Sequence, residues 1–557
     1  MQSRRRHAAA ILSVMALLFF VCIIPAGLIA SMPQRWRLPL GLRAVRGGGT
    51  TPTSSGRHSP LPEAVLLPEW QVLVLLRRTN DASTTAPGPG NATCVFRGGV
   101  SSPARSLGSL PASGRHAYTC IIPEPARVHY HHDAPAPLLV FAASTVITAG
   151  DGALPRMLKW SDRVVYESAV IDGGDVLVFA RGVNTRKKVN RAAQDIRCLY
   201  YHGDAGNAVA SLPATTSAQQ VFRCPPPPPA TTTTPAELRV TLAVAGEEEP
   251  IPSLATYDPT RHHAPMAPGN KKRLICACTM IRDMAKFLRE WVVYHAAVGV
   301  DRFYVYDNGS EDDLTDEVRR LTSSGFDIST ETWPWPKTQE AALSHGAAVH
   351  RDACEWMVFI DADEFIFSPH WARSENPAKS MLRSVVASVK QDVGQVSLWC
   401  ADFGPSGRTA HPEEGVTQGY TCRRKTMERR KSFVRLTAVD ESLVNSIHTF
   451  TLKPGFQARW NTRARVNHYK YQAWEEFKVK FHRRAPTYTA DWTEKVELGS
   501  NDRTPGLGFE PVEPTGWPQK FCDVNDTLLR DVTRRWFGVG FGNNFAHPQI
   551  AGTNHGS

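Results

Sequence analysis

Two carboxylates one residue apart, Asp361 and Asp363, form the only Asp-x-Asp in the chain. They follow Trp356 to Ile360, a hydrophobic run with the composition of a buried strand. Strand alternation places both carboxylates on one face, together with Met357 and Phe359. Burying two carboxylates side by side is costly unless a cation lies between them. The spacing therefore predicts a site for Mg²⁺ or Mn²⁺, which prefer carboxylate and phosphate oxygens.

The segment before these carboxylates alternates predicted strands and helices. Arg273 to Thr279 (RLICACT) and Arg302 to Tyr306 (RFYVY) have the composition of buried strands. Between them, apolar residues recur at helical spacing from Phe287 to Val298, with Asp283 as the predicted cap and Gly299 as the stop. This order predicts a βαβ unit in a parallel sheet. Such sheets bind ligands beyond the carboxyl ends of their strands.

Two polar residues at these ends are candidates for contact with a bound nucleotide. Asp307 directly follows the second predicted strand, at the expected position for binding a ribose or a base edge. The same sequence, DNGSEDD, also suits a tight turn, with Ser310 and Asp313 resembling a capping box. Gln339 opens the helix predicted for residues 338–354 and is the second candidate, with an ordinary helix-start residue as the alternative.

The length and the charge of the chain limit the classes of protein to which it can belong. A chain of 557 residues with 42% hydrophobic residues is expected to form two or more folded units. The formal charge is +11, but eight arginines precede the first acidic residue, Glu63. The basic balance therefore belongs to the N-terminal arm, and no nucleic-acid partner is predicted.

The N-terminal arm contains a predicted membrane anchor. Residues 8–32 carry no charged side chain and are long enough to span a bilayer, with a cleavable signal peptide as the alternative. Cys22 lies in this segment, and the ten other cysteines form an even set suited to pairing in an oxidising lumen. Sequons at Asn91, Asn308 and Asn525 also follow the anchor. A single-pass type II membrane protein is predicted, with glycans at Asn91 and Asn525.

The remaining chain divides by composition. Residues 65–249 contain short β runs broken by turn residues, and the runs at 163–171 and 176–181 predict a hairpin. The predicted organisation is a cytosolic tail (1–7), a single transmembrane helix (8–32), a stem (33–64), a β-rich module (65–249), a linker (250–271) and an α/β domain (272–557).

Several separated motifs resemble glycosyltransferase family 92, in its plant branch that includes galactan β-1,4-galactosyltransferases. The motifs are the run from Cys276 to Asp313, FIDADEFIF, DFGPSG from Asp402 to Gly407, and NHYKYQAWEEFKVKF from Asn467 to Phe481. The resemblance covers about 272 to 500. It implies a GT-A fold, a nucleotide-sugar donor such as UDP-galactose, inversion at the anomeric carbon, and a Golgi type II topology.

The resemblance also implies roles for individual residues. Asp361 and Asp363 would hold the cation that bridges the donor diphosphate, and His468 would complete metal or diphosphate binding. Sugar transfer also needs a base for the acceptor hydroxyl. Asp402 is the candidate, ahead of Glu413 and Glu414, with a loop-capping carboxylate as the alternative. The basic stretch from Arg423 to Lys431 is expected to be a solvated face, with an acidic glycan site as the alternative.

The predicted function is metal-dependent transfer of a hexose, galactose from UDP-galactose, to a glycan acceptor such as the pectic galactan of the cell wall. The β-rich module is a candidate carbohydrate-binding module. Two alternatives stay open: a non-catalytic glycan-binding membrane protein on the same fold, and a metal-dependent phosphohydrolase that uses the same carboxylates.

Overall fold

The structure, a computed structural model of the chain, describes part of its length. The described residues are 63–76, 92–130, 135–141, 156–171, 173–184, 190–203, 205–229, 238–260, 271–387, 389–480 and 513–542. The predicted tail, the predicted anchor, most of the predicted stem and the sequon at Asn91 lie outside these ranges. Within them, no helix combines the length and the apolar character needed to cross a membrane.

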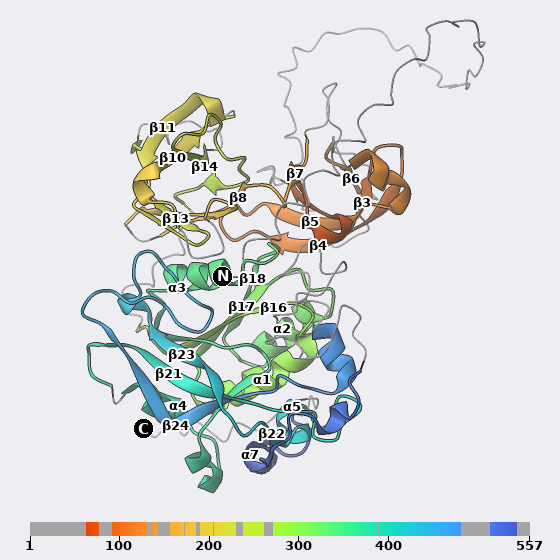
Figure 1. The fold of residues 1–557 in the computed structure, drawn as a ribbon, viewed down its shortest axis with the longest axis vertical. Helices are drawn as coiled ribbons and strands as arrows, with labels where there is room; N and C mark the ends of the chain where they lie inside the picture. The colour runs from red at the N-terminus through yellow and green to blue at the C-terminus, as the bar shows by residue number, and fades with distance from the viewer. Residues whose placement is uncertain are drawn as a thin grey trace, which may run out of the picture. The chain divides into compact units, whose positions relative to one another are not determined.

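The N-terminal module is built from strands, as its short β runs predict. Its sheets have the orders β6-β3-β4-β5-β2-β1-β7, β11-β10-β14-β15 and β12-β13-β9-β8 (Figure 1). The strands are β1 (Glu63–Leu66), β2 (Gln71–Leu76), β3 (Ala92–Val95), β4 (Ser101–Ser109), β5 (His116–Ile121), β6 (Leu138–Phe141), β7 (Leu158–Lys159), β8 (Val164–Val170), β9 (Val176–Arg181), β10 (Ile196–Tyr201), β11 (Ala208–Pro213), β12 (Thr216–Ala218), β13 (Val221–Cys224), β14 (Leu238–Val244) and β15 (Thr256–Tyr257).

The predicted hairpin is confirmed, because β8 and β9 pair antiparallel. The β structure also extends further than the sequence predicts. β15 lies in the stretch assigned to the linker, and it pairs antiparallel with β14.

The second half of the chain contains a mixed sheet of eight strands with the order β18-β17-β16-β19-β23-β21-β24-β20. This confirms the α/β class. The strands are β16 (Arg273–Ile281), β17 (Arg302–Asp307), β18 (Ile328–Thr332), β19 (Cys354–Phe359), β20 (Glu364–Phe367), β21 (Val393–Asp402), β23 (Glu428–Arg435) and β24 (Gln457–His468). The helices are α1 (Ala285–Val298), α2 (Leu314–Ser323), α3 (Gln339–Val349), α4 (Ser380–Ala387), α5 (Val416–Gly419) and α7 (Leu528–Phe537), and a two-stranded sheet joins β22 (Cys422–Arg423) to β25 (Val524–Asn525).

The predicted βαβ unit is confirmed by β16, α1 and β17, because β16 and β17 pair parallel. Gly299 ends α1 as predicted, with a φ of 133° that side chains rarely adopt. The predicted cap at Asp283 is wrong. The Asp312 carboxylate accepts the first helical N–H, from Ala285, at 2.8 Å, whereas Asp283 lies in the left-handed region at φ 50°.

Side chains of the central strands alternate between two cores. Ile275 and Ala277 of β16 pack with α1, whereas Cys276 and Cys278 pack with α3 and aromatic residues of the N-terminal module. Strand alternation requires this, because successive side chains point to opposite faces. The central strands are therefore buried on both faces.

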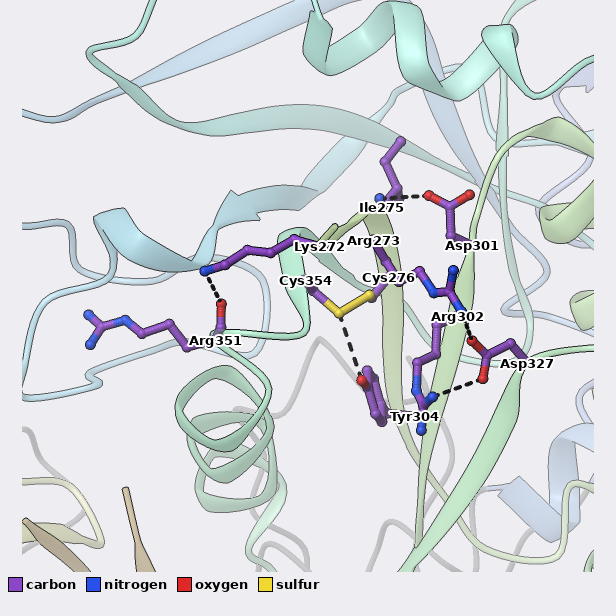
Figure 2. The surroundings of a disulfide bond; sticks show 10 residues. All are labelled: Lys272, Arg273, Ile275, Cys276, Asp301, Arg302, Tyr304, Asp327, Arg351 and Cys354. Carbon is purple, nitrogen blue, oxygen red and sulfur yellow. Dashed lines mark hydrogen bonds and ion pairs between the residues drawn. A yellow bond between two sulfur atoms is a disulfide. The ribbon is translucent and has the colours of Figure 1, made fainter. Parts of the chain in front are cut away.

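A disulfide joins two of the central parallel strands. Cys276 of β16 and Cys354 of β19 are bonded with their Cα atoms 6.1 Å apart, although 78 residues separate them in sequence. Figure 2 shows the bond beside Tyr304, whose hydroxyl lies 3.8 Å from the Cys354 sulfur. A bridge that closes so long a loop contributes about 4 kcal/mol in the chain-entropy account. It stabilises the strand that leads to Asp361.

The cysteines pair less completely than their even number suggests. Besides the bond in Figure 2, the disulfides are Cys94–Cys120, Cys198–Cys224 and Cys422–Cys522. Cys278 and Cys400 stay unpaired and buried. The prediction of ten paired cysteines is therefore wrong for these two, which lie in the hydrophobic cores.

Acid is expected to destabilise the fold through His295. This fully buried side chain donates from Nδ1 to the Trp291 carbonyl at 2.9 Å, and its Nε2 accepts from Ile366 at 3.3 Å. Burial lowers the pKa of His295 to about 3. The unfolded chain, with a histidine pKa of about 6.5, binds this proton first as the pH falls. The free energy of unfolding should therefore decrease by about 1.4 kcal/mol per pH unit between these two values.

A urea titration series between pH 4 and 7 tests this expectation. His295→Gln should reduce the slope of unfolding free energy against pH by about one proton. His370→Gln, at an exposed histidine, is the control and should leave the slope unchanged. Equal slopes in the wild type and His295→Gln would contradict the assignment.

Candidate active site

Asp361 and Asp363 lie in a turn rather than along a strand. β19 ends at Phe359, and β20 starts at Glu364. The turn is closed by the Glu364 N–H, which donates to the Asp361 carbonyl at 3.0 Å, while the Asp361 N–H donates to the Glu364 carboxylate at 2.9 Å. The strand predicted through Asp363 is therefore wrong. The chain reverses there because β20 pairs antiparallel with β24.

Each aspartate is paired with a lysine. The Lys431 ammonium donates to Asp361 at 3.0 Å and lies 2.9 Å from Glu364. The Lys480 ammonium contacts Asp363, whose side chain is 2% exposed. Gln339 at the start of α3 donates a longer hydrogen bond, 3.4 Å, to the other oxygen of Asp361. The two carboxylates thus face cationic groups on both sides of the turn.

His468, at the end of β24, lies beside the turn as the resemblance implies. Its Nδ1 is 3.1 Å from Oδ1 of Asp402, at the end of β21. Its Nε2 is 3.8 Å from both Asp363 Oδ2 and Glu364 Oε1. This nitrogen is buried and makes no hydrogen bond with the described residues. Because a carboxylate only accepts, Nδ1 donates to Asp402, and in the neutral ring Nε2 presents its lone pair to the acidic turn.

Burial and charge set the ionisation of these groups. Burial raises the pKa of Asp402, but His468 and Lys470 outweigh it and hold the pKa well below its usual value. For Asp363, burial is likewise outweighed by Lys480 and His468, so the pKa is lowered. Burial dominates at Glu364 and raises its pKa despite the attraction of Lys431. Asp363 and Asp402 are therefore ionised at neutral pH.

The site fits a divalent cation that a substrate helps to bind. Among the described residues, no group of three or more Asp, Glu, His or Cys side chains already converges at ligand spacing. Asp361, Asp363 and the unpaired Nε2 of His468 nevertheless provide oxygen and nitrogen donors at one place. Mg²⁺ sites typically combine one or two carboxylates with substrate phosphates. The Asp402 carboxylate accepts from Nδ1 on the other side of the His468 ring, and contacts of this kind orient histidines that bind metals.

A cleft of about 670 Å³ opens onto these carboxylates. Its other polar lining includes Arg282, Asn308 and Lys337. Asp307 does not line it, and the Asp307 carboxylate accepts the Ser310 N–H at 2.8 Å.

The capping box predicted from Ser310 and Asp313 does not form. The Asp313 side chain makes no cap hydrogen bond, and the Ser310 hydroxyl accepts the Asp283 N–H at 3.0 Å. Ser310 therefore stabilises the loop before α1 instead of the start of α2.

Sequence reasoning missed three charged residues of the site. Glu364 follows the Asp-x-Asp directly, but it reads as part of the hydrophobic run. The basic stretch predicts a solvated face for Lys431, yet this residue is 2% exposed. The sequence feature that indicates burial of Lys431 is its position directly before the apolar end of β23. Lys480 reaches Asp363 from a distant part of the chain, and no local pattern marks it.

Asn308 is expected to stay unglycosylated although it lies in a sequon. Its Nδ2, the atom that glycosylation would modify, donates to the carbonyls of Trp333 at 2.7 Å and Trp335 at 3.0 Å. A glycan there would also fill the cleft. Asn525 on β25 is exposed. Peptide mapping of active protein purified after passage through the secretory pathway should find glycan at Asn525 and none at Asn308, and a glycan on Asn308 in active protein would contradict this.

Comparison with known proteins defines the class. The model for glycosyltransferase family 92 matches residues 271–496. A family 92 protein of Arabidopsis thaliana is 35% identical over 493 residues, which cover 86% of this chain and 83% of that protein. A second, from Oryza sativa subsp. japonica, is 36% identical over 504 residues, with coverages of 86% and 80%. The chain is thus a glycosyltransferase. Within that class, it belongs to glycosyltransferase family 92.

Solved structures are similar only at a low level. Glucosyl-3-phosphoglycerate synthase from Mycobacterium tuberculosis, in complex with phosphoglyceric acid, is 14% identical and covers 40% of this chain and 84% of its own, with a TM-score of 0.20.

Proposed function

We propose that this glycosyltransferase is a metal-dependent, inverting enzyme of the GT-A type that transfers galactose from UDP-galactose to a glycan such as pectic galactan. One observation supports the proposed metal dependence. The buried Nε2 of His468 has no hydrogen-bond partner among the described residues and faces two carboxylates, while Asp402 holds the opposite side of the ring. A cation between these groups satisfies all of them. The galactose donor rests on the sequence resemblance alone.

Different residues of the cleft would bind different parts of the donor. Asp361, Asp363 and His468 would hold the cation, which, when bound, neutralises charge on the departing diphosphate. Arg282, Lys337 and Lys480 line the same cleft with cationic groups suited to phosphate oxygens. Gln339 and Asn308 supply neutral amides near the donor.

A donor screen with the purified lumenal part tests the proposal. Nucleoside diphosphate release is measured for UDP- and GDP-sugars with a glycan acceptor, with Mn²⁺ and after chelation. UDP release from UDP-galactose that depends on Mn²⁺ supports it, and linkage analysis of the product then identifies the bond formed. Release of inorganic phosphate instead would indicate a phosphohydrolase, and no release from any donor would overturn the proposal.

We place the enzyme in the Golgi membrane with its catalytic domain in the lumen. Four disulfides among the described residues support this, since such bonds persist in oxidising compartments. Protease treatment of sealed Golgi vesicles should leave the C-terminus protected, and its digestion would contradict this topology.

A further inference from the structure

The N-terminal module contributes part of the wall of the active-site cleft. Pro68, Glu69, Gln71 and Ile121, all from the module, line the same cleft as the carboxylates of Asp361 and Asp363. Glu69 and Ile121 are exposed, and the Ile121 side chain is 55% exposed. The catalytic domain therefore lines the cleft with charged side chains. The module adds one carboxylate, Glu69, and one apolar side chain, Ile121.

The module is held against the catalytic domain by polar and aromatic contacts. Thr332 of β18 donates from its hydroxyl to the Leu107 carbonyl at 3.0 Å, and the Arg105 guanidinium donates to the Ser310 carbonyl at 2.5 Å. The indoles of Trp160 and Trp335 stack with ring centroids 5.8 Å apart. Both tryptophans are buried. These contacts place the backbone of the module, and with it the segment around Glu69, next to the cleft.

The carboxylates that line this cleft differ in whether they form ion pairs or hydrogen bonds with the protein. Asp361 and Asp363 are paired with lysines, as described above. Asp283 accepts the Glu311 N–H at 2.5 Å, and Glu311 lies 3.5 Å from Arg282. Among the described residues of the lining, Glu69 is the one carboxylate with neither an ion pair nor a hydrogen bond.

The backbone around Glu69 is held in an unusual conformation. Glu69 and Trp70 both have positive φ, 60° and 61°, which side chains rarely adopt. The turn is fixed by the Gln71 N–H, which donates to the Pro68 carbonyl, and by the Ile122 N–H, which donates to the Trp70 carbonyl at 2.9 Å. Strained positions of this kind persist where the surrounding structure holds them, and they occur often at functional sites.

We propose that Glu69 is the catalytic base that takes the proton from the acceptor hydroxyl, an inference that rests on the proposed sugar transfer. As the acceptor oxygen forms its bond to the anomeric carbon, the bond from that carbon to the diphosphate breaks. The diphosphate leaves with the electron pair, and the hydroxyl proton moves to the Glu69 carboxylate. The exposed Ile121 beside it offers an apolar surface for the sugar ring of the acceptor.

The test compares Glu69→Gln with Glu248→Gln, an exposed glutamate of the same module that does not line the cleft. Glu69→Gln should reduce transfer to the acceptor by about 100-fold or more, the usual contribution of a positioned base. Its melting temperature and its affinity for UDP with Mn²⁺, measured by calorimetry, should stay unchanged. Glu248→Gln should behave as wild type.

The outcomes separate this inference from the proposed function. If the wild type transfers sugar and Glu69→Gln retains more than about a third of that rate, Glu69 is not the base, but the proposed function stands. Loss of UDP affinity in Glu69→Gln would also overturn the assignment, since a base acts on the acceptor rather than the donor. A wild type that releases no nucleoside diphosphate from any donor would overturn both.

Discussion

Asparagine at Asp361 or Asp363 should lower Mn²⁺-dependent UDP release by about 1000-fold. The cation supplies several kcal/mol of charge stabilisation to the departing diphosphate, and each 1.36 kcal/mol corresponds to a factor of ten in rate. An amide keeps the shape of the carboxylate but loses its charge. The affinity for Mn²⁺ together with UDP should fall in parallel. Activity assays and calorimetry with each single variant measure both quantities.

Stability distinguishes this prediction from a purely structural role. Lys431 and Lys480 already neutralise the two carboxylates, so their mutual repulsion is small. The Asp361 side chain is 28% exposed and the Lys480 side chain is 17% exposed, so water reaches one member of each ion pair. Without metal, the melting temperature of either variant should therefore stay within about 4 °C of wild type.

The control is Asp352→Asn, which removes an exposed carboxylate that pairs with Lys272. It should affect neither activity nor Mn²⁺ affinity. Full Mn²⁺-dependent turnover in both Asp361→Asn and Asp363→Asn would contradict the metal-site proposal. A large drop in melting temperature with normal turnover per folded molecule would instead make the two residues structural.

Local sequence patterns predicted the elements that position the site. The apolar spacing from Phe287 to Val298 and the flanking hydrophobic runs defined the βαβ unit, because burial on both faces demands such residues. They could not locate the turn after Phe359. Hydrophobic residues stand on both sides of the Asp-x-Asp, and the reversal depends on pairing with β24, a strand much later in the chain.

The charged surroundings of the site were less accessible to sequence reasoning. The roles of His468 and Asp402 came from motif resemblance, and their mutual contact depends on the parallel pairing of β21 and β24. Lys431 and Lys480 each reach the turn through a contact distant in sequence, which no local pattern encodes. Glu69 reaches the cleft only because the module packs on the catalytic domain. Such long-range packing decides which charges meet.

For Asp402, the sequence and the structure indicate different roles. The sequence nominates it as the base. In the structure it is 2% exposed, contacts His468 at 3.1 Å and Lys470 at 3.4 Å, and does not line the cleft of about 670 Å³. We therefore expect Asp402 to position His468 and to act on the metal through it.

Asp402→Asn separates the two roles. The new amide must direct its NH₂ group toward either Lys470 or His468, and Lys470 is itself a donor. The NH₂ group should therefore face His468 and make Nδ1 an acceptor, which moves the ring proton to Nε2 and removes the lone pair that would bind the cation. Loss of a hydrogen-bond partner that orients a metal-binding histidine weakens metal binding by about 10- to 100-fold.

Mn²⁺ titration of the transfer rate decides between them. If Asp402 positions His468, the half-saturating Mn²⁺ concentration of Asp402→Asn should rise by about 10- to 100-fold, and the rate at saturating Mn²⁺ should stay within a few-fold of wild type. If Asp402 is the base, the saturated rate should fall by about 100- to 10,000-fold, and the Mn²⁺ requirement should not change. The second result would also remove the need for Glu69, because one hydroxyl proton requires only one base. Asp402→Asn and Glu69→Gln therefore belong in the same experiment, since the two residues cannot both fill that role.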